Sequence, residues 1–316
     1  MTALVTGAAG FIGSHLCAAL LEAGERVRAI DSFTDYYPRS LKEENLAEIR
    51  SREGFSFIEL DLLEAPLHSL LDGVSVVYHL AGQPGVRASW GREFDAYTAN
   101  NVLVTQRLLE ACRTRTTVRK FVYASSSSVY GAAERFPTPE TARPAPRSPY
   151  GVTKLAAEHL CELYRDNFGV PTASLRLFTV YGPRQRPDMA FSRLVEAALD
   201  GRPFELYGDG QQTRDFTFVA DVVEAFRSAA RSSWCGVANV GGGARRSMRD
   251  VLAIVESICG TVRIEHRPPE AGDVRDTSAD TSTARSAFGY EPAVSLADGL
   301  AAMIAWRRGR ILSTVR

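Results

Sequence analysis

Tyr150 and Lys154 are the residues of this 316-residue chain whose types and spacing point most directly to chemistry. They lie four positions apart, so a helical segment would place both side chains on one face. A tyrosine hydroxyl titrates near about pH 10, and a neighbouring ammonium group favours its ionised form. The pair therefore predicts a general base, although the same spacing also occurs on ordinary surface helices.

Four consecutive serines at positions 125–128 follow a short apolar run that is typical of a β-strand. Side chains that come just after the strands of an open parallel sheet lie at the edge where such sheets bind ligands. We therefore expect these hydroxyl groups at the carboxyl edge of the sheet.

Three glycines, Gly7, Gly10 and Gly13, separate a predicted strand at residues 3–6 from a predicted helix. Glycines allow a tight turn and a close backbone approach, and the first amides of a helix can bind an anion. The pattern predicts a pyrophosphate site, and a simple strand-to-helix turn is the alternative.

Two acidic residues that follow predicted strands could complete a dinucleotide site. Asp31 lies 24 positions after Gly7, where a carboxylate accepts hydrogen bonds from adenosine ribose hydroxyls and repels a 2′-phosphate, which favours NAD over NADP. Its alternative role is that of a cap or turn residue. Asp61 and Leu62 could line an adenine pocket, or Asp61 could be an ordinary loop residue.

Apolar runs of strand length alternate with segments of helical period along the first half of the chain. We expect strands at residues 3–6, 27–30, 56–60, 74–80, 120–124 and 173–178, and helices at 11–23, 102–112 and 150–167. In the last helix an apolar stripe is predicted from Leu155, Ala156, Leu160 and Leu163.

This alternation predicts an α/β fold, a Rossmann-type doubly wound parallel sheet with a smaller C-terminal substrate-binding domain. After Gly182 the pattern becomes irregular and rich in proline. We expect a dinucleotide-binding domain at residues 1–178, to which residues 215–241 return, and a second domain at 179–316.

Composition favours small-molecule partners. The 37 Lys and Arg residues balance the 37 Asp and Glu residues, so no large net charge attracts nucleic acid or a membrane surface. The 5 cysteines show no CxxC pairing and the histidines show no ligand spacing, so no disulfide framework and no metal are expected. We expect reduced cysteines and a cytoplasmic protein.

Residues 1–21 contain no Asp, Glu, Lys or Arg and superficially resemble a signal peptide. Their three glycines and the lack of a basic n-region argue against that interpretation.

Several motifs in a fixed order identify a family resemblance. They are TGAAGFIG at 6–13, HLAG at 79–82, SSSSVYG at 125–131, SPYGVTK at 148–154, GDGQQTRDF at 208–216, VANVG at 237–241 and GDVRDTSAD at 272–280. Over nearly its whole length the chain resembles an extended short-chain dehydrogenase/reductase, and within that group a nucleotide-sugar epimerase.

The resemblance implies roles for three catalytic residues. Ser126 would hydrogen-bond the sugar 4-hydroxyl, Tyr150 would remove its proton, and Lys154 would hold the nicotinamide ribose. Hydride would pass from C4 to bound NAD+ and return to the other face of the 4-keto sugar, so the cofactor is regenerated in each turnover. The resemblance also implies a homodimer that packs through helices 102–112 and 150–167.

The resemblance further implies two sets of binding residues. Expected at the cofactor are Gly7, Gly10, Phe11, Ile12, Gly13, Asp31, Asp61, Leu62, Leu80, Ala81, Tyr150, Lys154 and Phe178. Expected at the UDP-sugar are Arg87, Ser126, Ser127, Ser128, Tyr150, Thr179, Arg186, Arg214 and Arg275, with the last two at the pyrophosphate.

The stretch FTVYGP at 178–183, followed by RPDMA at 186–190, resembles UDP-glucuronate 4-epimerases. The hydroxyl of Thr179 and the guanidinium of Arg186 could recognise a C5 carboxylate. Arg186 could instead simply pair with Asp188. Arg184 and Gln185 are more typical of UDP-glucose enzymes, so a UDP-glucose or UDP-N-acetylglucosamine 4-epimerase remains an alternative.

Two further alternatives are a UDP-glucuronate decarboxylase and a non-catalytic NAD-sensing protein. Decarboxylases of this superfamily generally carry an acid where this chain has Ser128, which favours epimerisation. Relatives that only sense NAD typically lack the tyrosine and lysine, and both are present here.

Overall fold

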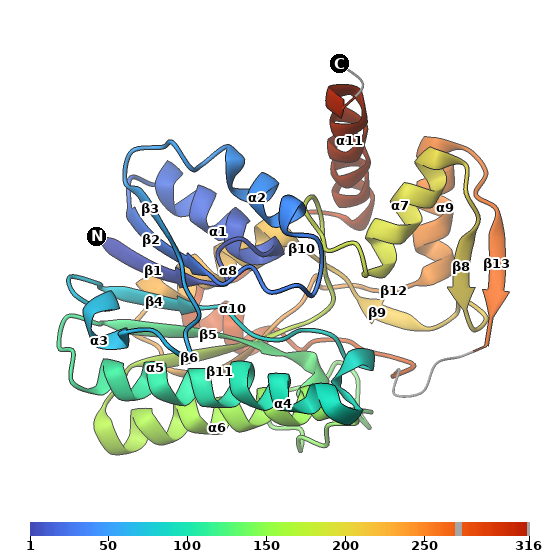
Figure 1. Cartoon of the computed structure of the whole chain (residues 1–316). Helices are drawn as coiled ribbons and strands as arrows, with labels where there is room; N and C mark the ends of the chain where they lie inside the picture. Colours follow the sequence, from blue (N-terminus) through green and yellow to red (C-terminus); the bar gives the residue numbers. More distant parts are fainter. Residues whose placement is uncertain (269–273, 315–316) are drawn as a thin grey trace.

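The computed structural model describes residues 1–268 and 274–314, and its centre is a parallel sheet of seven strands. The strand order β11-β6-β5-β4-β1-β2-β3 turns outward in both directions from β1, as in a doubly wound sheet (Figure 1). The strands are β1 (Thr2–Thr6), β2 (Arg26–Asp31), β3 (Phe55–Glu59), β4 (Val76–His79), β5 (Lys120–Ser126), β6 (Thr172–Leu177) and β11 (Gly236–Val240). The predicted fold class and the first six strands are confirmed.

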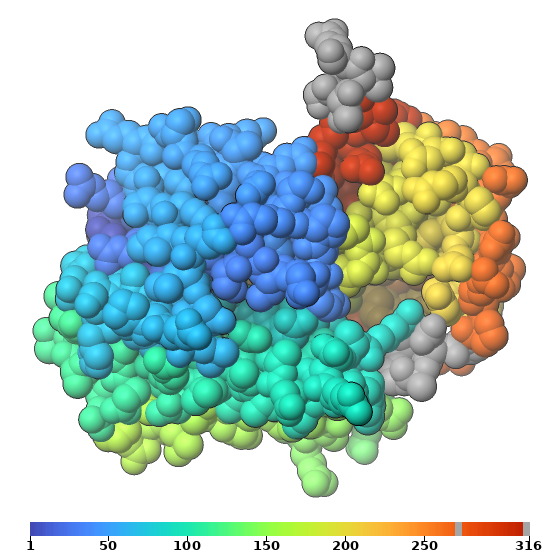
Figure 2. Space-filling view, in the orientation of Figure 1, coloured from blue at the N-terminus to red at the C-terminus, as the bar shows by residue number. Residues whose placement is uncertain are grey.

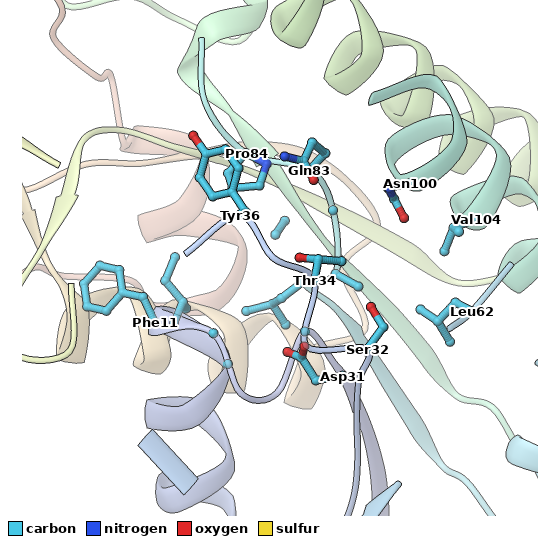
Figure 3. Close-up of a pocket in the computed structure, with 18 of the residues that line it drawn as sticks. Phe11, Asp31, Ser32, Thr34, Tyr36, Leu62, Gln83, Pro84, Asn100 and Val104 are labelled. Atoms are coloured by element: carbon cyan, nitrogen blue, oxygen red, sulfur yellow. The ribbon is translucent and has the colours of Figure 1, made fainter. Parts of the chain in front are cut away.

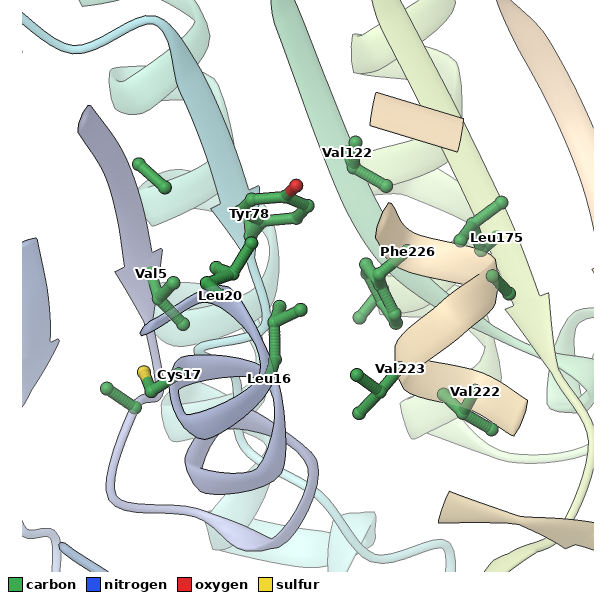
Figure 4. Close-up of a cluster of buried hydrophobic side chains, with 14 of the residues drawn as sticks. Val5, Leu16, Cys17, Leu20, Tyr78, Val122, Leu175, Val222, Val223 and Phe226 are labelled. Carbon is green, nitrogen blue, oxygen red and sulfur yellow. The ribbon is translucent and has the colours of Figure 1, made fainter. Parts of the chain in front are cut away.

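Helices cover both faces of this sheet. One face carries α1 (Phe11–Glu22), α8 (Val219–Arg231) and α10 (Ser282–Phe288), and the other carries α3 (Leu67–Leu70), α5 (Val104–Arg113) and α6 (Pro149–Phe168). Figure 4 shows Leu16 and Leu20 of α1 and Phe226 of α8 packed toward apolar strand residues. Because both faces are covered, the strands are almost continuously apolar.

The fully buried face of α6 is offset from the predicted apolar stripe and combines polar with apolar residues. Ala157 and Cys161 are buried together with Lys154 and Glu158, while Leu163 is 55% exposed. Leu155, Ala156 and Leu160 of the predicted stripe are half-buried, and Leu155 and Leu160 pack against apolar clusters. The stripe prediction is therefore confirmed in part and fails at Leu163.

A second region holds short strand pairs and three helices. Its helices are α7 (Ala190–Asp200), α9 (Met248–Cys259) and α11 (Leu296–Thr314), packed on one core. Its strand pairs are β8 (Phe204–Tyr207) with β13 (Ile264–Arg267), β9 (Thr213–Asp215) with β12 (Arg245–Ser247), and β7 (Val180–Tyr181) with β10 (Thr217–Phe218). Gly272 and Asp273 of the GDVRDTSAD motif lie outside the described residues.

The chain crosses between the two regions more than once. After β10, helix α8 and strand β11 lie in the layers of the large sheet, where Val237 of β11 aligns with Ser174 of β6. Helix α10, from the predicted second domain, also packs on α8 and β11. Figure 2 shows the yellow and orange second region in contact with the blue N-terminal part.

Helix α2 (Arg39–Ala47) and its C-terminal end connect the two regions through ion pairs. Glu48 pairs with Arg184 at 3.0 Å, and Glu44 pairs with Arg310 of α11. Within the described chain, no helix is both long enough and apolar enough to cross a membrane.

His15 of α1 is a half-buried group whose titration links pH to stability. Its Nε2 lies 2.9 Å from the Pro183 carbonyl oxygen, and burial lowers its pKa to about 4. The unfolded chain therefore binds this proton near about pH 6.5, well before the folded protein does. Stability from this group is complete above that pH and decreases as the pH falls toward about 4.

Replacing His15 by glutamine removes the titration and keeps a donor for the Pro183 carbonyl. Between pH 7 and pH 5 we expect the free energy of unfolding of the wild type to decrease by about 2 kcal/mol relative to the variant. Urea denaturation at both pH values measures this difference. The exposed His159→Gln variant is the control, and identical pH responses of wild type and His15→Gln would contradict the account.

Candidate active site

One large cavity lies at the carboxyl ends of β1, β2, β4 and β5. It encloses about 1230 Å³, including open space at its mouth. Figure 3 shows Asp31 and Ser32 at the carboxyl end of β2, Asn100 and Val104 on the helical side, and Tyr36 beside Pro84. The cavity thus lies where open parallel sheets bind ligands.

The glycine turn forms one wall of the cavity. Gly7 has a φ of +69°, and a Cβ there would lie 2.8 Å from the backbone nitrogen of Ala81. A Cβ on Gly13 would overlap the Gly7 carbonyl oxygen. Helix α1 begins directly after this turn, and no side chain caps its first turn. Its amides and dipole therefore suit a pyrophosphate, which is the fit expected for a dinucleotide.

Asp31 holds the adjoining loop and also lines the cavity. Its carboxylate accepts hydrogen bonds from the backbone N–H groups of Ala9 (3.0 Å) and Phe33 (2.9 Å). Burial raises the pKa of this carboxyl, while these two amides and the nearby Lys42 lower it. Asp31 therefore combines the predicted position beside the glycine turn with the alternative role of a turn residue.

Tyr150, Lys154 and Ser126 converge where β5 meets the start of α6. Ser148 caps α6 by accepting from the Gly151 N–H at 3.1 Å, which fixes Tyr150 in the first turn. Lys154 Nζ donates to the Ala124 carbonyl at 2.9 Å and lies 6.0 Å from the centre of the Tyr150 ring. The Ser126 side chain hydrogen-bonds Tyr150. As predicted, Tyr150 and Lys154 lie on one face of the helix, and both line the cavity.

The charges around this group add one cation to the predicted pair. Burial raises the pKa of Tyr150 above its ordinary value and outweighs the Ser126 hydrogen bond and the positive charge of Arg186, which lower it. Burial also lowers the pKa of Lys154 to about 8, against the raising effect of Glu158. Arg186 is therefore a cation beside Tyr150 that the spacing of Tyr150 and Lys154 did not reveal.

Most of the predicted cofactor residues line this one cavity. They are Gly7, Gly10, Phe11, Ile12, Gly13, Asp31, Asp61, Leu62, Leu80, Ala81, Tyr150 and Lys154. Phe178 does not line it, because its buried ring packs 6.2 Å from the Tyr130 ring in a separate apolar cluster. Its side chain follows the strand alternation away from the cavity.

The predicted substrate residues occupy three places. Tyr150 and Arg186 line the cavity. Ser127 and Ser128 form a helical turn beside it, where Ser126 Oγ accepts from the Ser128 N–H at 3.1 Å. Thr179 lies beyond them, after β6 and outside the cavity lining, and its backbone carbonyl accepts from the Thr217 N–H at 3.0 Å.

The other three predicted arginines lie in or against the second region. The Arg214 guanidinium donates to the Arg275 carbonyl at 2.8 Å, so these two residues are neighbours as predicted. Arg87 lies over the Tyr207 ring at 4.8 Å. The described lining of the cavity includes none of the three.

Asn101 supports the wall of the cavity, and the motifs did not reveal it. It lies in a π-helical turn, Thr98–Leu103, that precedes α5. Its Oδ1 accepts from the Gln83 N–H at 2.7 Å, and its Nδ2 donates to Thr153 at 3.0 Å, one residue before Lys154. Such π-turns are frequent at functional sites, but the sequence carries no signal that separates one from ordinary helix.

Replacing Gly13 by alanine tests the glycine turn, because the new methyl group must displace the backbone of Gly7. We expect the purified protein to contain much less NAD, measured by chromatography after acid release, and to melt at a lower temperature. Gly309→Ala is the matched control, since a Cβ there meets nothing within 4 Å. Normal NAD content in Gly13→Ala would show that the turn does not hold the cofactor.

Comparisons with known proteins agree with this geometry. Residues 3–241 match the NAD dependent epimerase/dehydratase family. A Bacillus subtilis protein named "Uncharacterized UDP-glucose epimerase YtcB" is 47% identical over 97% of this chain and 98% of its own. A UDP-glucuronate 4-epimerase from Thermodesulfobacterium geofontis is 34% identical over 98% of this chain and 96% of its own.

A solved structure gives the same picture in three dimensions. It is the UDP-glucuronic acid 4-epimerase of Bacillus cereus in complex with UDP-glucuronic acid and NAD, with a TM-score of 0.94. That protein is 45% identical, and the match covers 98% of this chain and 100% of that one. The resemblance drawn from the motifs is confirmed, and the chain belongs to the NAD dependent epimerase/dehydratase family of extended short-chain dehydrogenase/reductases.

Proposed function

We propose that the protein is a UDP-glucuronate 4-epimerase that interconverts UDP-glucuronate and UDP-galacturonate with bound NAD. The observation that carries this proposal is the place of Arg186, whose guanidinium lines the same cavity as Tyr150 and Lys154. A fixed positive charge beside the base suits a sugar that carries a carboxylate. The Bacillus cereus relative, which binds UDP-glucuronic acid and NAD, supports it.

Each end of the cavity has a separate task. The glycine turn would hold the pyrophosphate of NAD, Asp31 its adenosine ribose and Lys154 its nicotinamide ribose. When bound, NAD+ supplies a hydride acceptor for sugar C4 and, with its cationic ring, a further positive charge near Tyr150. Arg214 and Arg275 would hold the pyrophosphate of the UDP-sugar from the second region.

The protein's own residues handle the proton of the sugar 4-hydroxyl. Ser126 would orient this hydroxyl, and Tyr150 would take its proton at the phenolate oxygen. Because burial raises the Tyr150 pKa, the positive charges of Arg186 and the bound cofactor must favour the tyrosinate. The resulting 4-keto sugar could then turn within the open cavity before reduction.

UDP-glucose is a second candidate substrate, favoured by one observation. The Nε and Nη2 atoms of Arg186 already bind the Asp188 carboxylate, at 2.9 and 3.0 Å, so this charge is balanced without a substrate acid. The name of the Bacillus subtilis relative points the same way.

Decarboxylation is disfavoured by the carboxylates around the cavity. Among its described lining residues the acids are Asp31, at the end of β2, and Asp61, which follows β3, both on the cofactor side. Ser128 stands where decarboxylases generally carry an acid. An acid that could move protons near C5 is therefore missing from the described lining.

A product assay distinguishes epimerisation of UDP-glucuronate, epimerisation of UDP-glucose and decarboxylation. The purified protein, without added NAD, is incubated with UDP-glucuronate and separately with UDP-glucose, and the sugar ring is followed by NMR. UDP-galacturonate from UDP-glucuronate supports the proposal. Conversion of UDP-glucose alone would keep the reaction and change the substrate, and UDP-xylose would overturn the argument from Ser128.

Replacing Tyr150 by phenylalanine removes the base and leaves the ring. We expect kcat to fall by about 10²- to 10⁴-fold, while UDP-glucuronate still binds in titration calorimetry. Tyr78→Phe, in the core against Phe226, is the control and should keep normal turnover. A Tyr150→Phe protein with wild-type kcat would show that another group is the base and would favour a sensor role for this fold.

We also infer that the protein forms a homodimer through α5 and α6. Three large apolar side chains of α6, Val152, Leu163 and Phe168, are 49 to 55% exposed, and Leu103 just before α5 is 48% exposed. Exposed apolar patches of this kind mark protein interfaces. The five cysteines are all unpaired, which fits the reducing cytoplasm as the location.

Leu163→Glu should separate the dimer, because a buried carboxylate in an apolar interface lacks a partner. We expect light scattering to give the mass of one chain for this variant and of two chains for the wild type. Ile311→Glu on α11, which is 38% exposed in the wild type, is the control and should remain dimeric. A monomeric wild type would contradict the inference.

The division of labour within the chain follows from these assignments. We propose that residues 1–178, together with 215–241, bind the cofactor and that residues 179–316 bind the UDP-sugar. The pair Arg214 and Arg275 supports the second assignment.

A further inference from the structure

Arg186 reaches the cavity from a loop, yet its guanidinium is held firmly from two sides. Its side chain is 19% exposed, and the Nε and Nη2 atoms form a bidentate pair with Asp188. The Nη1 atom makes no hydrogen bond with the described residues. Because a guanidinium is planar, fixing one edge also fixes the direction of the other edge.

Tyr36 supplies the second support. It lies in the loop after β2 and lines the cavity, and its ring centre is 5.6 Å from the Arg186 guanidinium carbon. Its hydroxyl lies 3.5 Å from Asp188 Oδ2, the oxygen that also binds Arg186 Nη2. Tyr36 therefore contacts both members of the ion pair. It belongs to the first region of the chain, whereas Arg186 and Asp188 belong to the second.

The surrounding backbone leaves space for this arrangement. A Cβ on Gly85 would overlap the Tyr36 hydroxyl, and Gly85 has a φ of +100°, which other residues rarely adopt. The Tyr97 hydroxyl donates to the Gly85 carbonyl at 2.8 Å, and the Tyr97 ring packs on Tyr150 at 6.2 Å. The support of Arg186 is thus continuous with the surroundings of the base.

The exposure of the two partners suggests how the pair works with a charged substrate. Asp188 is 42% exposed, so water screens its negative charge, while Arg186 is mostly buried. A second carboxylate at the remaining edge of Arg186 would therefore meet limited repulsion from Asp188. Without Asp188, the long arginine side chain would lose its fixed direction and the second carboxylate would have to order it.

We propose that Tyr36 and Asp188 are positioning residues that together orient Arg186 toward the substrate carboxylate and so determine selectivity for a uronic acid over a neutral hexose. This inference rests on the proposed function. It adds a structural basis for substrate specificity. Tyr36, from the loop after β2, and Asp188, two residues after Arg186, would orient the same guanidinium.

Equilibrium binding to NAD-loaded protein in the Tyr150→Phe background tests the proposal without turnover. Titration calorimetry gives Kd for UDP-glucuronate and for UDP-glucose. With Asp188→Ala added, we expect Kd for UDP-glucuronate to rise about tenfold, the size of one charge-assisted hydrogen bond, and Kd for UDP-glucose to stay within about twofold. Asp188→Asn keeps an acceptor and should recover part of the loss.

A matched control and a double variant sharpen the test. Asp200→Ala removes the carboxylate that pairs with Arg202 two residues away and should change neither Kd. Tyr36→Ala should also weaken UDP-glucuronate selectively. Because both residues support one guanidinium, the Tyr36→Ala/Asp188→Ala double variant should lose less than the product of the two single losses.

Several outcomes would overturn the inference. They are an equal loss for both sugars, an unchanged Kd, tighter binding of UDP-glucuronate by Asp188→Ala, or single losses that multiply. Failure of the parent protein to bind UDP-glucuronate while it binds UDP-glucose would instead overturn the proposed function, and this inference with it.

Discussion

The buried ammonium group of Lys154 is the constraint on which much of the structure depends. It lies beneath the cavity, and Glu158, one turn later on α6, opposes the effect of burial on its pKa. Glu158 is itself buried against Arg176 of β6 at 2.7 Å. Arg176 Nη1 donates to Tyr130, which donates to Asn239 of β11. A buried charge without partners is costly. The partners that balance the Lys154 charge therefore link α6 to β6 and β11.

The same constraint explains why the chain returns to the first sheet after beginning the second region. Asn239 completes the polar chain from β11, and its N–H donates to Glu140 at 2.8 Å. Asp215, at the end of β9, binds the N–H groups of Gly242 and Ala279. Strand β9, which carries Arg214, is therefore joined to the far edge of the sheet, and the two regions meet around one cavity.

The local patterns of the sequence predicted the sheet, the glycine turn and the tyrosine–lysine face, because each depends on short-range geometry. The buried face of α6 could not be predicted from hydrophobicity, since Lys154 and Glu158 are buried by their partners and not by their own character. The effect of Arg186 on Tyr150 and the contact of Tyr36 with Asp188 join residues far apart in the chain. Such contacts follow from the packing of two regions, which spacing alone does not encode.

The fate of the hydrogen on sugar C4 tests the central claim most directly. UDP-glucuronate that carries deuterium at C4 is incubated in ordinary water with the protein as purified, without added NAD, and the products are examined by NMR. The account predicts UDP-galacturonate that retains deuterium at C4, because the hydride leaves and returns within one closed cycle. Replacement of the label by solvent hydrogen, or formation of UDP-xylose with loss of the carboxylate, would contradict it.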